Sequence, residues 1–218
     1  LATPNQYRTA SGAPGPAYYQ NEADYKMDIV LDDKNSVLTG EETITYHNNS
    51  PQDLEYLWVQ LDQNIRKKDA PQKDGDGMAP VATAAGFANK YLETPFDGGF
   101  NIKEVSANGS DLKYTINQTM MRVDLPKPLQ AGEFALPFGD YEVNITVPAD
   151  HVMEATGELQ NRKDVYSKEM MKRYEQAKKS YDKPVIIVTQ EEAEKAEKNF
   201  SEKTKTWTYK ADMVRDFA

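Results

Sequence analysis

Several features are scarce in this sequence, and each scarcity excludes a class of function. The 218 residues include no cysteine, which excludes disulfides, thiol catalysis and zinc sites built on cysteine. No apolar run approaches the roughly 20 residues of a membrane-spanning helix, so we expect no membrane span. Lys and Arg number 26 against 35 Asp and Glu. The resulting net charge of −9 argues against a nucleic-acid surface, which needs clustered basic residues.

Histidine is almost as scarce, and the usual candidates for a site are isolated. His47 and His151 lie far apart in the sequence, and neither belongs to a His-Glu-x-x-His motif. A single histidine without convergent partners is no site, so we interpret both as surface or turn residues. Residues 74–77 (Asp-Gly-Asp-Gly) lack the third acidic position and closing Glu of a calcium loop. We expect no catalytic, cofactor-binding or metal-ligating residue in this chain.

Alternating apolar residues, which are typical of β-strands, dominate the first third of the chain. Residues 25–31 and 37–47 read as two strands, with Tyr25, Met27, Ile29 and Leu31 pointing inward. Residues 54–64 are apolar on both faces, which predicts a strand covered on both sides, with Trp58 in the core. Short polar turns between these segments predict an antiparallel meander of three strands.

Further strand signals follow a segment without a clear period. Residues 65–98 predict a long loop with one helical turn, and loops of this length are usually functional or docked. Asn108-Gly109 between alternating segments predicts a β-hairpin. A strand over residues 121–125 is expected to end at the prolines that follow. Other predicted strands are residues 141–147, a short strand or bend at 155–159, a buried-type strand at 184–188, and 204–210 with Trp207 and Tyr209 on one face.

Helical patterns are confined to the last quarter. Ser167 is a plausible N-cap for a largely solvated helix within residues 161–181. Residues 189–192 (Thr-Gln-Glu-Glu) fit a capping box for a helix that ends near residue 198, and Glu191, Glu192 and Glu194 read as its solvated face. The predicted fold is mostly β: a curved antiparallel or mixed, sandwich-like sheet domain with two short helices near the C-terminal end. We predict an extended arm over residues 1–20 and one β domain over 21–218.

Five stretches recur in an order known from one family. They are residues 25–28 with 38–46, residues 57–64 (Leu-Trp-Val-Gln-Leu-Asp-Gln-Asn), residues 138–150, residues 155–159 (Ala-Thr-Gly-Glu-Leu) and residues 207–218. Together they resemble the N-terminal domain of bacterial aminopeptidase N-like zinc metallopeptidases, the gluzincins. The resemblance covers most of the chain after residue 16, and its specificity comes from the order and number of the pieces.

The resemblance implies a non-catalytic module that packs on a thermolysin-like catalytic domain and shapes its substrate cleft. In that family the zinc ion and the His-Glu-x-x-His motif belong to the catalytic domain, which lies outside this chain. The chain alone is therefore expected to cleave nothing, although its parent would be a zinc metallo-aminopeptidase. The implied partners are the parent's own catalytic domain and, only in the full-length protein, a peptide substrate. We expect an extracytoplasmic location, periplasmic or at the cell surface.

The sequence departs from the family pattern at two places. Residues 129–132 (Leu-Gln-Ala-Gly) run directly into Glu133, where the family has a longer insertion with a Gln-Phe-x-Pro-Arg-like segment that reaches the substrate pocket. We therefore expect this domain's own contribution to substrate binding to be missing. The chain also stops inside an apolar segment, residues 214–218, before either catalytic motif. This favours the front part of a longer protein.

A second function fits the same strands. A stand-alone, cell-surface β-sandwich module that binds a glycan or a protein would need an exposed aromatic platform, for which Trp58, Trp207, Tyr209, Tyr18 and Tyr19 are the candidates. The docking hypothesis instead predicts an exposed apolar patch of several hundred Å² or so. A map of the exposed side chains distinguishes the two.

Overall fold

The computed structural model describes residues 3–68, 70, 97–132, 139–197, 201–214 and 216–218. It is mostly β, as predicted, with mixed and antiparallel sheets and three short helices near the C-terminal end rather than two. The chain forms two compact units, residues 1–50 with 132–218 (unit 1) and residues 51–131 (unit 2). No helix in the described ranges is both long and apolar enough to cross a bilayer.

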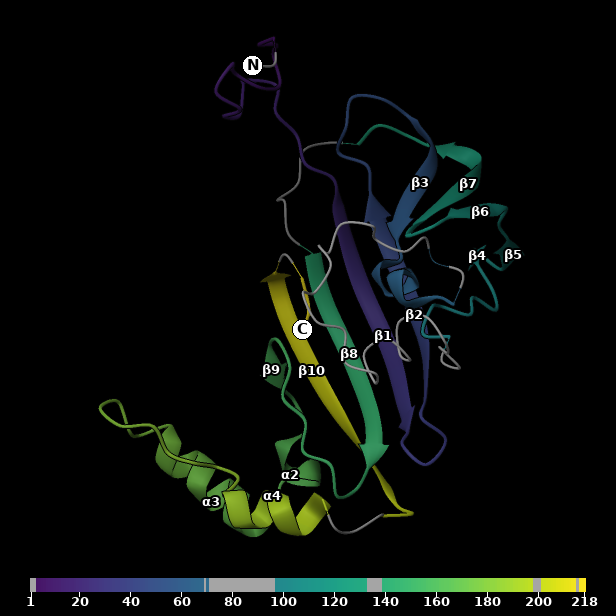
Figure 1. Cartoon of the computed structure of the whole chain (residues 1–218). Helices are drawn as coiled ribbons and strands as arrows, with labels where there is room; N and C mark the ends of the chain where they lie inside the picture. The colour runs from purple at the N-terminus through teal and green to yellow at the C-terminus, as the bar shows by residue number, and fades with distance from the viewer. Residues whose placement is uncertain (1–2, 69, 71–96, 133–138, 198–200, 215) are drawn as a thin grey trace, which may run out of the picture. The chain divides into compact units, whose positions relative to one another are not determined.

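Unit 1 is built on a five-stranded mixed sheet (Figure 1). The strand order is β2-β1-β8-β10-β9, in which β1 pairs antiparallel with β2 and parallel with β8, while β10 pairs antiparallel with both β8 and β9. The strands are β1 (Glu22–Asp32), β2 (Val37–His47), β8 (Gly139–Pro148), β9 (Glu158–Leu159) and β10 (Thr204–Val214). The alternating segments near residues 25–31, 37–47, 141–147 and 204–210 are thus confirmed as strands.

The β1–β2 hairpin forms as predicted, but the meander does not continue. Asp32 accepts hydrogen bonds from the backbone and side-chain nitrogens of Asn35, which fixes the turn. After β2 the chain passes through Asn48, Asn49 and Ser50, three buried polar residues, and leaves unit 1. The third strand pairs with β7 and not with β2, so the three-strand meander was wrong. Short polar turns indicate where a strand ends and say nothing about which strand the next one joins.

The core of unit 1 lies where β8, β10 and β9 meet the helical segment. Trp207, Tyr209 and Val147 are each about 1% exposed, and they pack with Leu159 and Val165. The Tyr209 hydroxyl donates to the carbonyl of Met153 at 2.8 Å, so its polar end is satisfied inside the core. Trp207 and Tyr209 therefore share one face of β10, as the alternation predicts.

Three helices follow β9: α2 (Arg162–Val165), α3 (Lys168–Ala177) and α4 (Gln190–Glu197). The Ser167 hydroxyl accepts from the Met170 backbone at 3.2 Å, which confirms the predicted N-cap. The capping box of α4 is also confirmed, since Thr189 and Glu192 each accept from the other's backbone nitrogen. Residues 184–188 form no strand, so that prediction was wrong: the segment lies in the loop that joins α3 to α4.

Unit 2 is a small antiparallel sheet of order β3-β7-β6 with a separate hairpin. Its elements are β3 (Leu54–Gln60), η1 (Asp62–Arg66), β4 (Ser106–Ala107), β5 (Ser110–Asp111), β6 (Tyr114–Asn117) and β7 (Met120–Leu129). Leu61, Met121 and Val123 form its core. Asn64 is 3% exposed, and its side chain donates to the Gln118 carbonyl and accepts from the Phe100 backbone N–H.

Local turn chemistry in unit 2 follows the sequence in one place and departs from it in another. Asn108 and Gly109 both have positive φ, which is the two-residue hairpin turn that Asn-Gly predicts. β7, however, runs through Pro126 and Pro128, so the expected stop at the prolines was wrong. The register against β3 shifts between Leu54 and Tyr56, and the prolines fall in this irregular stretch, where no ladder N–H is needed.

The structure describes residues 65–68, 70, 97 and 98 of the long segment 65–98 in unit 2. The 3₁₀ helix η1 covers residues 62–66, mostly within the strand predicted over residues 54–64, and the helical turn expected within residues 65–98 stays a prediction. Residues 69 and 71–96, which include the Asp-Gly-Asp-Gly stretch 74–77, lie outside the described residues. In unit 1, residues 3–20 contain a turn closed by the backbone bond from Gly12 to Thr9 and an isolated bridge between Arg8 and Pro14. The boundaries predicted for the arm and the β domain stay a prediction.

Candidate functional site

One face of the five-stranded sheet carries nearly all of its apolar side chains, and we call it the inner face. The register places Tyr25 of β1 between Ile44 of β2 and Tyr141 of β8, with Ala211 of β10 next in the same row. Because directly opposed residues point to the same side of a sheet, each such row runs across four strands. The inner face comprises Leu38, Gly40, Glu42, Ile44 and Tyr46 of β2; Ala23, Tyr25, Met27, Ile29 and Leu31 of β1; Tyr141, Val143, Ile145 and Val147 of β8; and Lys205, Trp207, Tyr209 and Ala211 of β10.

The inner face has a covered half, on β8 and β10. Val143 is fully buried and Val147, Trp207 and Tyr209 are about 1% exposed. Leu159 of β9, together with Val165 of α2 and Met153 of the preceding loop, packs over this half. The chain therefore supplies its own cover here, and this half acts as the core of unit 1.

The open half of the inner face lies on β2 and the adjoining part of β1, although Leu31 of β1 packs against the covered core. Leu38 is 68% exposed and Ile44 is 38% exposed, although both share the face that is buried on β8 and β10. Tyr25 and Met27 beside them on β1 are only partly buried. An apolar stretch continuous with a core but left in solvent is typical of an interaction surface.

Glu42 stands in the middle of the open half, opposite Met27. Burial against its apolar neighbours raises the pKa of its carboxyl above the ordinary 4.5. Desolvation likewise raises the pKa of the Tyr25 and Tyr141 hydroxyls, with the Glu42 charge as a further cause in each case. A carboxylate that points inward on an edge strand opposes uncontrolled strand pairing, because pairing would bury its charge.

The outer face of the same sheet is polar and internally paired. Glu142 of β8 lies 3.6 Å from Lys26 of β1 and 2.9 Å from Lys210 of β10. The hydrogen bond and charge of Lys210 hold the pKa of Glu142 below its ordinary value. One row further, Asn144 donates to Asp28 and accepts from Thr208. This face therefore needs no partner to satisfy its polar groups.

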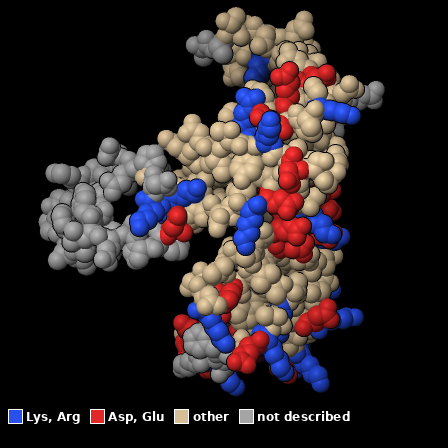
Figure 2. All heavy atoms as spheres, turned by 90° about the vertical axis from the view of Figure 1, so that its right-hand side faces the viewer, with Lys and Arg blue, Asp and Glu red and all other residues tan. Residues whose placement is uncertain are grey.

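The two histidines sit beside single carboxylates. His47 Nε2 lies 3.4 Å from Asp24, and His151 Nδ1 lies 3.1 Å from the neighbouring Asp150. Among the residues described by the structure, no three His, Asp or Glu side chains gather in a way that could hold a metal ion. On the face that Figure 2 shows, acidic and basic side chains are interspersed, so no extended basic surface for a nucleic acid is visible there.

The aromatic residues proposed as a platform are not brought together. Trp207 and Tyr209 are buried in unit 1, and in unit 1 the Arg8 guanidinium lies over the Tyr18 ring. Trp58, expected in a doubly covered strand, is 55% exposed, so its assignment to the core was wrong. In β3 only the face that carries Val59 packs on the unit 2 core. Sequence alternation alone could not tell a buried aromatic from an exposed one.

Trp58 instead belongs to an exposed cluster on unit 2 that alternation did not indicate. Its ring meets that of Tyr56 edge to face, with centroids 6.1 Å apart. The Arg122 guanidinium lies 4.1 Å from the Tyr56 ring centroid and donates to Asp124 at 2.7 Å. The signal for this cluster is the register, which sets Trp58 opposite Arg122 and Tyr56 opposite Asp124.

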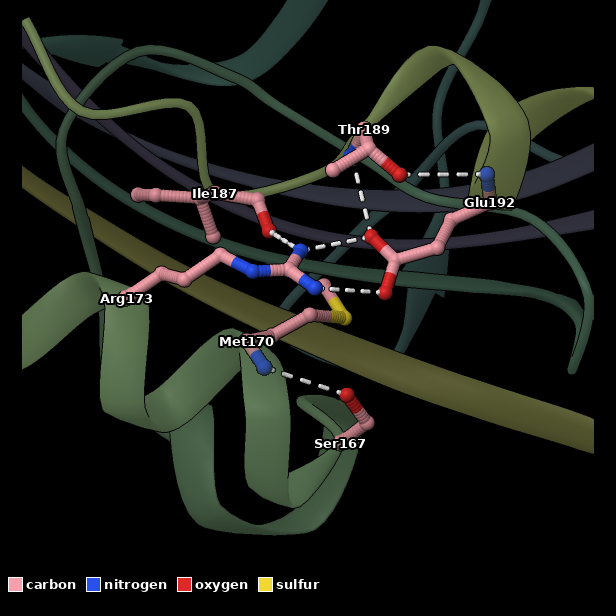
Figure 3. A network of polar contacts seen from close by, with 6 residues as sticks. All are labelled: Ser167, Met170, Arg173, Ile187, Thr189 and Glu192. Atoms are coloured by element: carbon pink, nitrogen blue, oxygen red, sulfur yellow. Dashed lines mark hydrogen bonds and ion pairs between the residues drawn. The ribbon is translucent and has the colours of Figure 1, made fainter.

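The helical segment is held by a clamp of ion pair and cap (Figure 3). The Arg173 guanidinium of α3 donates to both carboxylate oxygens of Glu192 in α4, at 2.6 and 2.8 Å, and to the Ile187 carbonyl at 2.6 Å. The Arg173 hydrogen bonds and the Thr189 backbone N–H lower the pKa of Glu192 to about 2. Arg173 therefore joins α3 to α4, and the nearby charge of Glu169 in α3 adds to the causes that raise its pKa. Glu192 is thus a clamp residue and not part of a purely solvated face.

Comparisons with known proteins find a distant structural likeness and no matching family model. No protein-family model matches the chain, and no curated protein matches it. Among solved structures, a mutant of a two-domain M1 zinc metallopeptidase bound to L-tryptophan is similar to it, with 12% sequence identity and a TM-score of 0.41. The similarity covers 91% of this chain and 41% of that one, so the chain spans less than half the length of that metallopeptidase.

Proposed function

We propose that this chain is the non-catalytic N-terminal β domain of a zinc aminopeptidase-like metallopeptidase, and that its open half is the surface on which the catalytic domain docks. The observation that carries the proposal is the split of the inner face, which is buried around Val147 of β8 and Trp207 of β10 and exposed at Leu38 and Ile44 of β2. The order of the five gluzincin-like stretches supports the choice of partner.

The properties of the open half are those of an interface. Its residues are apolar, they continue a packed core, and a single carboxylate, Glu42, lies among them. Burial of such a surface by a partner domain is favourable, at about 25 cal/mol for each Å² of apolar area. In this proposal the zinc ion, its ligands and the general base belong to the catalytic domain, and the side chains of this chain bind and orient that domain.

The activity of the chain is the first test. We expect the purified 218-residue chain, supplied with zinc, to leave aminoacyl-anilide substrates intact. Hydrolysis that a chelator abolishes would contradict the proposal. The parent reading frame provides the second test, because it must continue into a segment with His-Glu-x-x-His. A reading frame that ends without that segment would also contradict it.

A glycan-binding module is the second candidate, and the Trp58 cluster favours it. An exposed indole beside a fixed Arg122–Asp124 pair offers a stacking face and oriented polar groups, which are the contacts a sugar ring uses. Glycan binding by the chain that Trp58→Ala abolishes, and that Leu38→Asp leaves unchanged, would favour this function. Failure of every tested glycan to bind leaves docking as the proposal.

A further inference from the structure

The loop between α3 and α4 ends in a turn with a large exposed aromatic side chain. The Ser180 hydroxyl donates to the Lys183 carbonyl and closes the turn. Tyr181 at its apex is 94% exposed, and Ile186, in the segment that leads back to α4, is 69% exposed. We call residues 178–186 the tip. Figure 1 shows that it extends beyond α3, on the side away from α4. Two large apolar side chains on one short turn have a cost in water, which a partner would remove.

The clamp described above holds the tip at its base. Arg173 binds the Ile187 carbonyl directly after the tip and Glu192 in α4 (Figure 3). On the other side the tip follows α3 without a break, because the Lys178 backbone N–H donates to the Tyr174 carbonyl. The tip is therefore presented by fixed helices, and little ordering entropy would be lost when it binds.

The charge around the tip is opposite in sign to that of the whole chain. Residues 161–189 contain eight Lys or Arg against four Asp or Glu, whereas the chain has 26 against 35. Lys178, Lys179 and Lys183 lie within the tip and are exposed, together with one acidic residue, Asp182. Lys178 Nζ lies 3.6 Å from Glu175 Oε1 of α3, so part of its charge is already balanced. The acidic residues of α4 follow the clamp, on the far side of α3 from the tip.

We propose that the tip binds the surface of a lipid bilayer that carries anionic headgroups. Tyr181 and Ile186 would enter the headgroup region, where tyrosine is favoured and aliphatic side chains leave water. Lys178, Lys179 and Lys183 would remain at the level of the headgroups and attract their negative charge. The binding is peripheral, and it is independent of the docking face on β1 and β2.

The shape of the tip favours a bilayer over a macromolecular partner. A convex turn buries its apolar side chains only in a matching groove or in a deformable interface. A nucleic acid would require an extended basic surface, and the acidic chain as a whole opposes it. A second copy of this chain is the other occupant, and vesicle flotation together with light scattering distinguishes it from a bilayer.

Vesicle flotation tests the proposal with the full chain. We expect it to float with vesicles of phosphatidylcholine mixed with phosphatidylglycerol, not with phosphatidylcholine alone, and to be released by salt. Each lysine contributes roughly fivefold to such binding. Replacement of Lys178, Lys179 and Lys183 by Gln should therefore weaken it by roughly a hundredfold, and Tyr181→Ser with Ile186→Ser should abolish it.

Matched variants elsewhere in the chain serve as controls. The triple change of Lys103, Lys113 and Lys127 to Gln alters the net charge equally on unit 2, and Val152→Ser removes an exposed apolar side chain of unit 1. Both should float as the unchanged chain does. Absence of binding to anionic vesicles, or binding that the tip variants leave intact, overturns the proposal. Self-association in light scattering that Tyr181→Ser abolishes, without vesicle binding, assigns the tip to a second copy and overturns it equally.

Discussion

The two halves of the inner face are made of similar residues and have different surroundings. On β8 and β10 the chain covers Val147 and Trp207 with β9 and α2, whereas on β1 and β2 it leaves Leu38 and Ile44 in solvent. Both halves alternate with period two, although β2 also places Gly40 and Glu42 on this face. Among the described residues, β9 and α2 pack over the half on β8 and β10. An apolar strand face therefore indicates that the face is favourably buried, but it does not indicate whether the same chain or a partner buries it.

Trp207→Ala should have the largest effect on the chain. The side chain is buried at 1% exposure, and its loss leaves a cavity in the covered half. We expect the free energy of unfolding to fall by about 3–5 kcal/mol. Chemical denaturation followed by circular dichroism measures it. A loss under 1 kcal/mol or so, within the range of surface substitutions, would mean that this half is not the core.

The stabilisation that the Arg173–Glu192 clamp gives to the folded chain should depend on pH in the acid range. The pKa of Glu192 is lowered to about 2 in the folded chain, against an ordinary value of 4.5. The unfolded chain therefore binds a proton first, so the stabilisation is present above pH 4.5 and is lost as the pH falls towards 2. We expect Arg173→Met to lower the melting temperature at pH 7 and to make the melting temperature fall less between pH 4.5 and 2 or so.

A comparison with Glu192→Gln sharpens that test. This variant removes the titrating group, so its melting temperature should vary less between pH 5 and 3 or so than that of the unchanged chain. The same acid dependence in both proteins would show that other carboxylates cause it.

The contribution of Glu42, in the open half, to stability should have the opposite pH dependence. Burial raises the pKa of its carboxyl above 4.5, so the folded chain takes up the proton before the unfolded chain does. Its contribution to stability therefore improves as the pH falls through the raised pKa, and the charge is unfavourable above it. We expect Glu42→Gln to raise the melting temperature slightly at pH 7, and aggregation to increase because the inward-pointing edge charge is lost. A lower melting temperature would show that the charge is favourable there.

The smallest effect is expected from Leu38→Ala in the chain alone. The side chain is already 68% exposed, so its truncation removes little packing. The free energy of unfolding should change by less than about 0.5 kcal/mol, in contrast to Trp207→Ala. A cost similar to that of a core truncation would show that Leu38 is covered in solution.

Much of the fold follows from local signals in the sequence. The alternation at residues 25–31 and 141–147, the Asn108-Gly109 turn and the Ser167 and Thr189 caps all depend on neighbours within a few residues, and all are confirmed. Local geometry is what these patterns encode.

Apart from the strand end expected at Pro126 and the number of short helices, the incorrect predictions concern contacts between distant segments. β3 pairs with β7 rather than β2, Trp58 is exposed, and residues 184–188 pair with no strand in the described part of the chain. The candidate docking face could be predicted only as a patch of unknown position. Its location depends on the parallel pairing of β1 with β8 and on the return of β9, neither of which leaves a local mark in the sequence.

The most direct test of the docking claim uses one double variant, Leu38→Asp with Ile44→Asp. Its effect is compared between the 218-residue chain and the full-length parent. In the 218-residue chain the two exposed positions should tolerate the change, and the unfolding transition should stay where it is. In the full-length parent the same variant should lower the melting temperature and reduce aminopeptidase activity, because charges would be buried at the interface. A parent protein that carries both substitutions with unchanged melting and activity would contradict the account.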